Sequence, residues 1–181
     1  MVGYPFANLG GFLNNPNVPA FTLPTGDWLN PATTVTQILA DLRAWEEFVI
    51  TTSGEGGSSG QMYPNVLALP GAEVSRLGDN AGVGTDTTIW DLFATKQSQG
   101  VREGKVGEWR LVRTPYAEDI LNTRRGTMYH MDRRVVRCEN PLAYEELAPQ
   151  ERNLHVYTPM VGRTAGVVYL RPAMSAYAAV G

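Results

Sequence analysis

The chain has 181 residues, of which 43% are hydrophobic and 18% charged, and its net charge at pH 7 is -3. This composition suits one ordinary domain with a packed core and excludes an intrinsically disordered chain. The small negative charge gives no basis for long-range attraction to nucleic acid or to a membrane surface, and the single cysteine excludes an intrachain disulfide.

The N-terminal segment, residues 1–33, carries five prolines and shows no helical period. These features predict an extended arm that lies on its own subunit or on a neighbour. The apolar side chains available for that contact are Phe6, Leu9, Phe12, Leu13, Phe21 and Leu23. The segment lacks the basic start and apolar stretch of a secretory signal, so we expect a soluble, intracellular chain with no membrane partner.

The strongest local pattern follows, because apolar residues recur at helical spacing over residues 35–49. Thr33 or Thr34 is placed to cap this helix. One face is expected to be buried against a sheet, and its members are Ile38, Leu42, Trp45 and Val49. The segment Ser53–Gly60 is rich in glycine and serine, so it ends the helix and predicts a mobile surface loop.

Three short elements follow in the middle of the chain. Asn65–Leu69 predicts a short buried strand, and Pro70 is placed to start a helix. A further helix begins after Thr87 or Thr88, either of which can cap it. The apolar face of that helix would comprise Ile89, Leu92 and Phe93.

Beyond Gly107 the apolar period changes to alternation, which predicts strands. The candidate strands are Trp109–Arg113, TMYHMD, VVRCE, LHVYTPM and AGVVYL. Val161–Thr164, between the last two, is typical of a hairpin connection. A helix-rich first half and a strand-rich second half predict an α+β fold with helices packed on a mainly antiparallel sheet.

Candidate catalytic residues are few. The segment Gly56–Gly60 matches the G-x-S-x-G pattern of serine hydrolases, but it follows a helix, whereas that nucleophile needs a strand before it. The histidines available as a base are His130 and His155, both in predicted strands. A small serine hydrolase that uses Ser58 is therefore the enzyme alternative, and a flexible loop is the favoured interpretation.

His130 and Asp132 share one face of a predicted strand, which suits a pair of metal ligands. Because no third ligand is evident, a surface ion pair is the favoured interpretation. Cys138 is interpreted as a half-buried strand residue rather than a reactive thiol. We therefore assign no catalytic, cofactor-binding or metal-binding residue.

Charge is divided unevenly along the chain. Residues 1–100 hold three basic and nine acidic side chains, whereas residues 101–181 hold twelve and nine. Chance is one explanation of this distribution. The other is that halves of opposite charge suit a protein that meets copies of itself edge to edge. The candidate subunit-interface residues are Arg124, Arg125, Arg133, Arg134, Arg137 and Arg163. The alternatives for these arginines are a solvated surface and contact with nucleic acid.

Several short motifs follow one another in a characteristic order. They are Gly10–Pro19, TQILADL, NVLALP, Tyr129, Pro141, Ala148-Pro149-Gln150, Arg163–Val167 and Pro172–Tyr177. In this order they resemble the central and C-terminal regions of the major capsid proteins of tailed bacteriophages and prophages. The resemblance spans nearly the whole chain.

The resemblance implies the Hong Kong 97 capsid fold, in which an axial and a peripheral domain tile an icosahedral shell. Residues 1–33 would be an extended arm or peripheral segment, and residues 34–141 an axial-domain-like core. Residues 142–181 would be C-terminal strands that return to the peripheral domain. The N-terminal arm, extended loop and spine helix that precede this region in the family are expected to be missing.

The resemblance also implies a structural subunit that self-assembles into a shell enclosing DNA, with no catalytic residue and no cofactor. Its partners would be copies of itself, portal and scaffolding proteins and, indirectly, the packaged DNA. It would lie in the virion capsid, and in the host cytoplasm before assembly. Such a tile should be elongated, with a radius of gyration above the roughly 16 Å of a compact chain. The serine hydrolase and a basic-strand module that binds an anionic partner are the alternatives.

Overall fold

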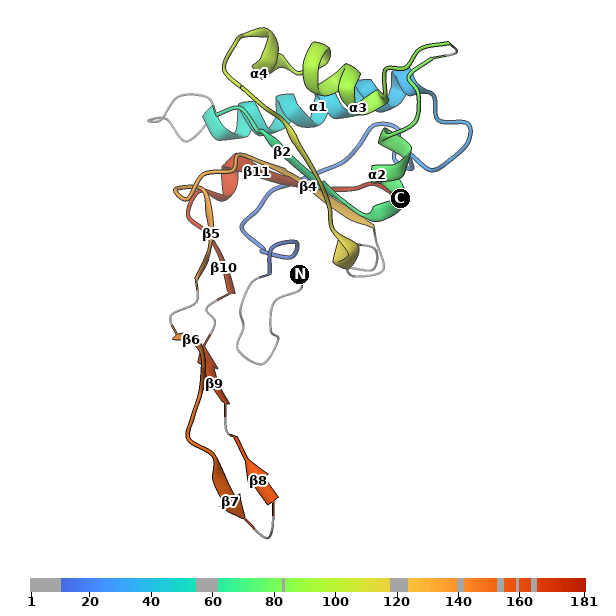
Figure 1. The fold of residues 1–181 in the computed structure, drawn as a ribbon. Coiled ribbons are helices and arrows are strands. Elements are labelled where there is room, and N and C mark those ends of the chain that lie inside the picture. Colours follow the sequence, from blue (N-terminus) through green and yellow to red (C-terminus); the bar gives the residue numbers. More distant parts are fainter. Residues whose placement is uncertain are drawn as a thin grey trace.

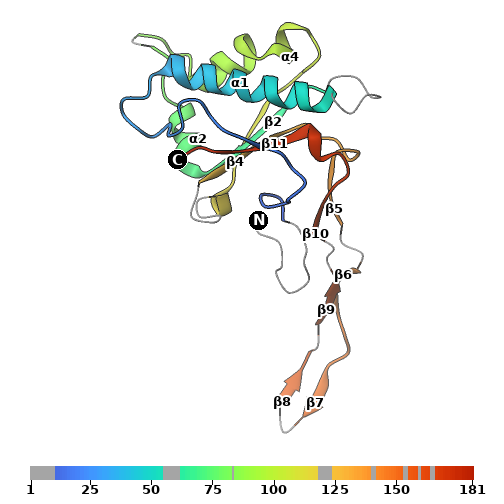
Figure 2. The ribbon, with the colours of Figure 1, turned by 180° about the vertical axis from the view of Figure 1, so that it is seen from behind.

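The computed structural model describes residues 11–54, 62–82, 84–117, 124–139, 142–152, 155–158, 160–163 and 166–181. Figure 1 shows a body, in which helices lie over one face of a β-sheet, and a long β-extension that leaves the body. We call residues 136–169 the β-extension. The back view in Figure 2 shows the same elongated outline, which confirms the predicted elongated shape.

The helix α1, Val35–Gly54, forms where the apolar period predicted it. Thr34 caps the helix. Its side-chain oxygen accepts a hydrogen bond from Gln37 N at 3.4 Å, and Gln37 Oε1 accepts one from Thr34 N at 2.8 Å. The predicted buried face is confirmed, because four of its side chains are fully buried: Ile38, Leu42, Trp45 and Val49.

The body contains a five-stranded sheet in the order β1-β11-β4-β2-β3. Its strands are β1 (Ala20–Phe21), β2 (Val66–Leu69), β3 (Arg110–Arg113), β4 (Arg125–Tyr129) and β11 (Ser175–Ala179). The α+β class is confirmed, but the sheet is mixed: β1 is parallel to β11 and β2 to β3, whereas β4 is antiparallel to both its neighbours. Parallel neighbours need a crossover connection, and the helices between β2 and β3 supply one.

In the described chain, three short helices and a π-helical turn connect β2 to β3. They are α2 (Gly71–Leu77), α3 (Ile89–Leu92), the turn η2 (Phe93–Gln97) and α4 (Gln99–Arg102). As predicted, Pro70 precedes α2, and Thr88 caps α3 by accepting a hydrogen bond from Asp91 N at 3.0 Å. The buried carboxylate of Glu46 on α1 accepts a hydrogen bond from Gln99 N at 2.8 Å, which anchors α4 to α1.

α1 packs directly on the centre of the sheet. A Cβ atom on Gly126 of β4 would lie 2.5 Å from Leu69 Cδ2 and 3.0 Å from Trp45 Cη2. Replacing Gly126 with alanine is therefore expected to lower the free energy of unfolding by about 1–3 kcal/mol through overpacking. Urea denaturation followed by tryptophan fluorescence measures this change.

The matched control for that substitution is Gly107→Ala, because a Cβ at Gly107 would meet nothing within 4 Å. It should change the free energy of unfolding by less than about 0.5 kcal/mol. A Gly126→Ala variant that unfolds at the same urea concentration as the wild type would contradict the close packing of α1 on β4.

The first described part of the N-terminal segment, around Phe12 and Leu13, packs on the other face of the sheet. Adjacent residues of a strand face opposite sides, so Arg125 lies on the face away from Gly126 and α1. Arg125 Nη1 donates a hydrogen bond to Leu13 O at 3.2 Å. The carbonyl of Phe12 accepts hydrogen bonds from the hydroxyls of Tyr169 at 2.7 Å and Tyr177 at 2.9 Å. The segment is therefore fixed to the sheet and to the base of the β-extension.

Two strands from opposite ends of the described chain pair in the central sheet. Strand β1, from the expected arm 1–33, pairs with β11 near the C-terminus. The expected arm does cover its own subunit in residues 11–33, whereas Phe6 and Leu9 lie outside the described residues. The expected C-terminal segment 142–181 is divided, because only its first part lies in the β-extension and β11 lies inside the body.

The β-extension consists of three two-stranded antiparallel ladders. They pair β5 (Val136–Glu139) with β10 (Gly166–Tyr169), β6 (Leu142–Glu146) with β9 (Met160–Arg163), and β7 (Gln150–Arg152) with β8 (His155–Tyr157). The hairpin predicted at Val161–Thr164 is wrong, because residues 160–163 form β9 and pair with β6. A glycine at position 162, considered only with its sequence neighbours, favours a turn. The chain instead reverses direction between β7 and β8.

Candidate functional site

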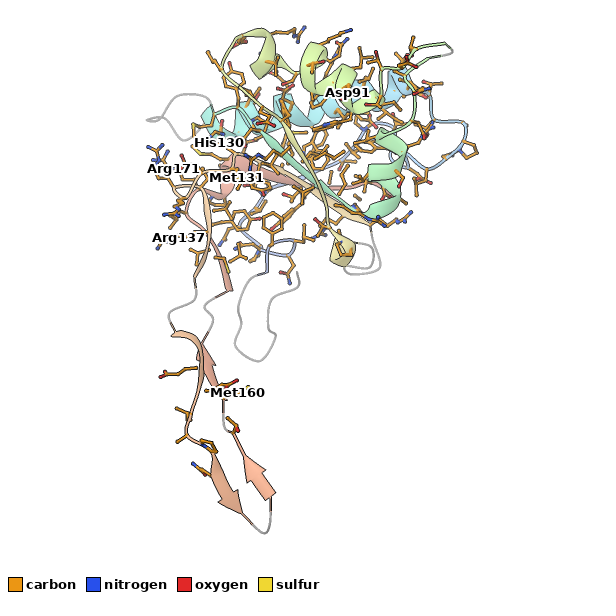
Figure 3. The ribbon with its side chains drawn as sticks, in the orientation of Figure 1. Asp91, His130, Met131, Arg137, Met160 and Arg171 are labelled. Atoms are coloured by element: carbon orange, nitrogen blue, oxygen red, sulfur yellow. The ribbon has the colours of Figure 1, made fainter. Side chains whose placement is uncertain are left out.

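The residues considered for a hydrolase do not come together in the described chain. Ser58 lies outside the described residues. His130 Nδ1 lies 2.8 Å from Tyr63 O, so a backbone contact occupies that ring nitrogen. His155 is in β8, near the far end of the β-extension, whereas His130 lies at the body (Figures 1 and 3). The two histidines therefore cannot serve one site within a subunit.

Asp132 pairs with Arg134 rather than with His130, so the expected ion pair is wrong in its partner. Arg134 Nη2 lies 3.0 Å from Asp132 Oδ2, and Arg134 Nε lies 3.2 Å from Oδ1. These hydrogen bonds lower the pKa of Asp132 to about 2. Strand β4 ends at Tyr129, so His130 and Asp132 do not share a strand face. Among the described residues, no three His, Cys, Asp or Glu side chains could hold a metal ion together.

One cluster of interacting titratable groups was not predicted from the sequence. The hydroxyl of Tyr63 donates a hydrogen bond to Glu103, and Lys105 Nζ lies 3.3 Å from the same hydroxyl. The bond to Glu103 is the main reason that the pKa of Tyr63 is raised. The cluster therefore connects the residues after α4 to Tyr63.

Arg124 and Arg125 contact their own chain. Arg124 Nη1 lies 3.4 Å from Oε1 of the buried Glu73. Arg125 donates to the backbone of Leu13, and its guanidinium carbon lies 5.5 Å from the centre of the Tyr177 ring. These two arginines therefore stabilise the body around β4.

Arg133, Arg134 and Arg137 lie apart from that pair, where the β-extension joins the body. Arg171 joins them, although nothing in the sequence pointed to it, because Leu170 N donates a hydrogen bond to Val135 O at 2.9 Å. Figure 3 shows Met131, Arg137 and Arg171 on the same side of this junction. All four arginines are exposed. Arg163 lies in β9, and its side chain is outside the described part of the structure.

Large exposed hydrophobic side chains concentrate on the same parts of the molecule. Among the described residues they are Met131 (54% exposed), Met160 (52%), Leu170 (46%), Leu147 (42%) and Val112 (40%). Met131 and Leu170 flank the junction, and Leu147 and Met160 lie on the β-extension. Cys138 of β5 is also exposed, which corrects the expectation of a half-buried side chain. A two-stranded ladder outside the body buries few of its side chains.

A model of the major capsid protein family matches residues 1–179. The chain belongs to the major capsid protein family. No curated protein matches the sequence of this major capsid chain. Among solved structures, the capsid of Myoviridae phage XM1 is similar to it, with a TM-score of 0.69 and 14% sequence identity over 91% of this chain and 51% of that chain. This major capsid chain therefore spans about half the length of that relative and shares its fold.

Family membership confirms the resemblance seen in the ordered motifs. The major capsid chain is a structural capsid subunit, not an enzyme, and neither the hydrolase nor the basic-strand module is favoured. None of the helices in the described residues combines the length and the apolar character that a membrane span requires. Among the described residues, four of the exposed arginines and most of the large exposed hydrophobic side chains lie at the junction and on the β-extension.

Proposed function

We propose that this chain associates with copies of itself into an icosahedral shell that encloses packaged DNA. The proposal includes a Hong Kong 97-type fold. Residues 34–141, together with β1 and β11, would supply the axial domain, and the β-extension would reach into the peripheral domain. The similarity in fold to a phage capsid chain supports this reading.

The β-extension is the observation that carries the proposal. Within the described residues each of its ladders has only two strands, so the outer backbone N–H and C=O groups of every strand point away from the ladder. An isolated two-stranded ladder is marginally stable in water, and an open strand edge is a template for pairing with another chain. A neighbouring subunit in a shell covers such a structure.

The arginines divide between two roles in this proposal. Arg133, Arg134 and Arg137, now joined by Arg171, are exposed where the β-extension leaves the body, so they would face a neighbour. Arg163 would do so from β9. Arg124 and Arg125 would contribute to the boundary indirectly, by holding β4 and the N-terminal segment in place.

The other proposed partners are those that an assembled shell would contact or enclose. Portal and scaffolding proteins would contact the assembled subunits, and DNA would be enclosed without being read by sequence. The subunit would lie in the virion capsid after assembly and in the host cytoplasm before it.

Shortening the β-extension tests the proposal. Residues 142–163 are replaced by a short Gly-Ser linker that joins Pro141 to Thr164, which retains the β5–β10 ladder. We expect this variant to keep the circular dichroism of a folded body and to stay monomeric. The wild-type chain should form closed particles in negative-stain electron microscopy and large species in sedimentation velocity.

The control for the shortened chain is Glu47→Ala, an exposed position on α1 in the body, which should assemble like the wild type. Assembly of the shortened chain at wild-type concentrations would contradict a role for the β-extension. A wild-type chain that stays monomeric at every concentration would contradict the proposed function itself.

A further inference from the structure

Two separate surface patches have matching apolar character and opposite charge. The shoulder patch consists of Met131, Arg133, Arg134, Arg137, Leu170 and Arg171, and all six side chains are exposed. The extension patch consists of Glu146, Leu147 and Met160, which are also exposed. Each patch therefore contains two large exposed hydrophobic side chains. The charged side chains of the shoulder patch are basic, and that of the extension patch is acidic.

The shoulder patch is held together by backbone contacts between two distant parts of the chain. Leu170 N and Arg171 N both approach Val135 O, at 2.9 and 3.4 Å. Val135 N in turn donates to Asp132 O at 2.9 Å. The bidentate contact between Asp132 and Arg134 fixes the turn from which Arg133 projects. The shoulder patch is therefore a preformed surface.

The extension patch lies on one face of the β6–β9 ladder. Glu146 and Met160 are direct cross-strand partners, so their side chains lie side by side on the same face. Leu147 follows Glu146 at the end of β6. Glu145 pairs with Val161 and lies on the opposite face, because neighbouring residues of a strand alternate.

The two patches cannot meet within one subunit. The β5–β10 ladder lies between the junction and the β6–β9 ladder (Figure 1). In Figure 3, Arg137 and Arg171 lie on the left of the molecule, whereas Met160 lies to the right of the β-extension. Each subunit therefore offers one patch of each kind, and each needs a different copy to cover it.

We infer that the extension patch of one copy docks on the shoulder patch of the next copy, so that subunits join head to tail. This inference rests on the proposed function and names the surfaces that carry it. Charge complementarity selects a second copy as the partner: Glu146 meets a surface with four arginines, of which Arg134 is also paired with Asp132. Burial of Met160 and Leu147 against Met131 and Leu170 removes apolar surface from water. Contacts between two different patches are heterologous, and they close into rings when the rotation between copies allows it.

The acidic helical layer of the body is the competing partner for the arginines. Glu47 of α1 and Asp86 before α3 are exposed there. That surface has none of the large exposed hydrophobic side chains of the described chain, so it would leave Met131 and Leu170 uncovered. The extension patch covers both the charge and the apolar side chains of the shoulder.

Charge reversal tests the inference. Glu146→Arg in the extension patch should weaken self-association at least tenfold, and so should the double variant Arg137→Glu with Arg171→Glu in the shoulder patch, because like charges would then face each other. An equal mixture of the two variants should recover association to within about threefold of the wild type, since every contact in an alternating assembly again pairs opposite charges. Sedimentation velocity over a range of concentrations measures both effects.

Two controls carry charge reversals elsewhere on the molecule. Glu145→Arg lies on the same strand but on the other face of the ladder, and it should associate like the wild type. The double variant Glu47→Arg with Asp86→Arg changes the helical layer and should also associate like the wild type. Thermal unfolding of each purified variant confirms that the body is folded.

The possible results separate the inference from the proposed function. If the wild type assembles while Glu146→Arg and the shoulder variant assemble equally well, the inference is overturned and the proposed function stands. If only the double variant of Glu47 and Asp86 loses association, the helical layer is the partner of the shoulder patch, and the inference is overturned. The inference is also overturned if the shoulder variant loses duplex-DNA binding but keeps self-association. A wild-type chain that never associates overturns both.

Discussion

Replacing Leu42 with alanine should lower the free energy of unfolding by about 2–5 kcal/mol. Leu42 is fully buried on α1 and belongs to the same core as Leu67 and Met128, which lie on two neighbouring strands of the sheet. The substitution removes apolar contacts and leaves a cavity that the helix and the sheet cannot both close. Urea denaturation monitored by circular dichroism at the helical wavelength measures the loss.

The neighbouring substitution Arg43→Ala controls for a general effect on the helix. Arg43 is exposed, so its replacement should change the free energy of unfolding by less than about 0.5 kcal/mol. Equal small effects at Leu42 and Arg43 would mean that α1 does not pack on the sheet.

Replacing Asp41 with alanine should cost about 3 kcal/mol, because it leaves buried donors without an acceptor. Asp41 is buried, and its carboxylate accepts hydrogen bonds from Trp28 Nε1 at 2.9 Å, Thr25 Oγ1 at 3.1 Å and Thr25 N at 3.2 Å. The loss should appear in urea denaturation together with a changed near-ultraviolet circular dichroism signal from Trp28.

Asp41→Asn is the informative comparison, because it keeps one acceptor oxygen and should lose less stability than the alanine variant. Glu47→Ala, an exposed acidic residue on the same helix, should be neutral. An Asp41→Ala variant with an unchanged Trp28 signal and unchanged stability would show that the contact does not hold residues 25–28 on α1.

Features set by local sequence could be predicted well. α1 starts after Thr34 because that residue and Gln37 form a capping box, and its buried face follows from the apolar spacing alone. Thr88 and Pro70 mark the starts of two shorter helices in the same way. Each of these signals depends on residues within one or two turns of each other.

Features set by distant pairing could not be predicted. β1 has two residues and pairs with β11 from the other end of the chain, so no local period marks it. β11 contributes Ala176 and Ala178 to the core, and their small side chains give a weak strand pattern. Gly162 was interpreted as part of a turn because its pairing partner β6 is fixed only by the full ladder.

The candidate interface was predicted in part for the same reason. The cluster of Arg133, Arg134 and Arg137 is visible as a run of basic residues, and the structure places all three on the exposed junction. Arg171 stands alone in the sequence and joins them only through the contact of Leu170 with Val135. Arg124 and Arg125 belong to the same run, yet their register on β4 directs them to Glu73 and Leu13 of their own chain.

The carbonyl oxygen of Phe12 connects the body and the β-extension through two hydrogen bonds. Tyr177 donates to it from the central sheet and Tyr169 donates to it from the base of the β-extension, so any swing of the extension stretches one of these two bonds. Burial raises the pKa of both phenols, which keeps their protons in place far above neutral pH. In the proposed shell, the angle of the extension relative to the body would set how strongly neighbouring subunits tilt, and hence the curvature of the particle. The stiffness of that curvature would then depend in part on two hydroxyl hydrogen bonds to a single peptide oxygen.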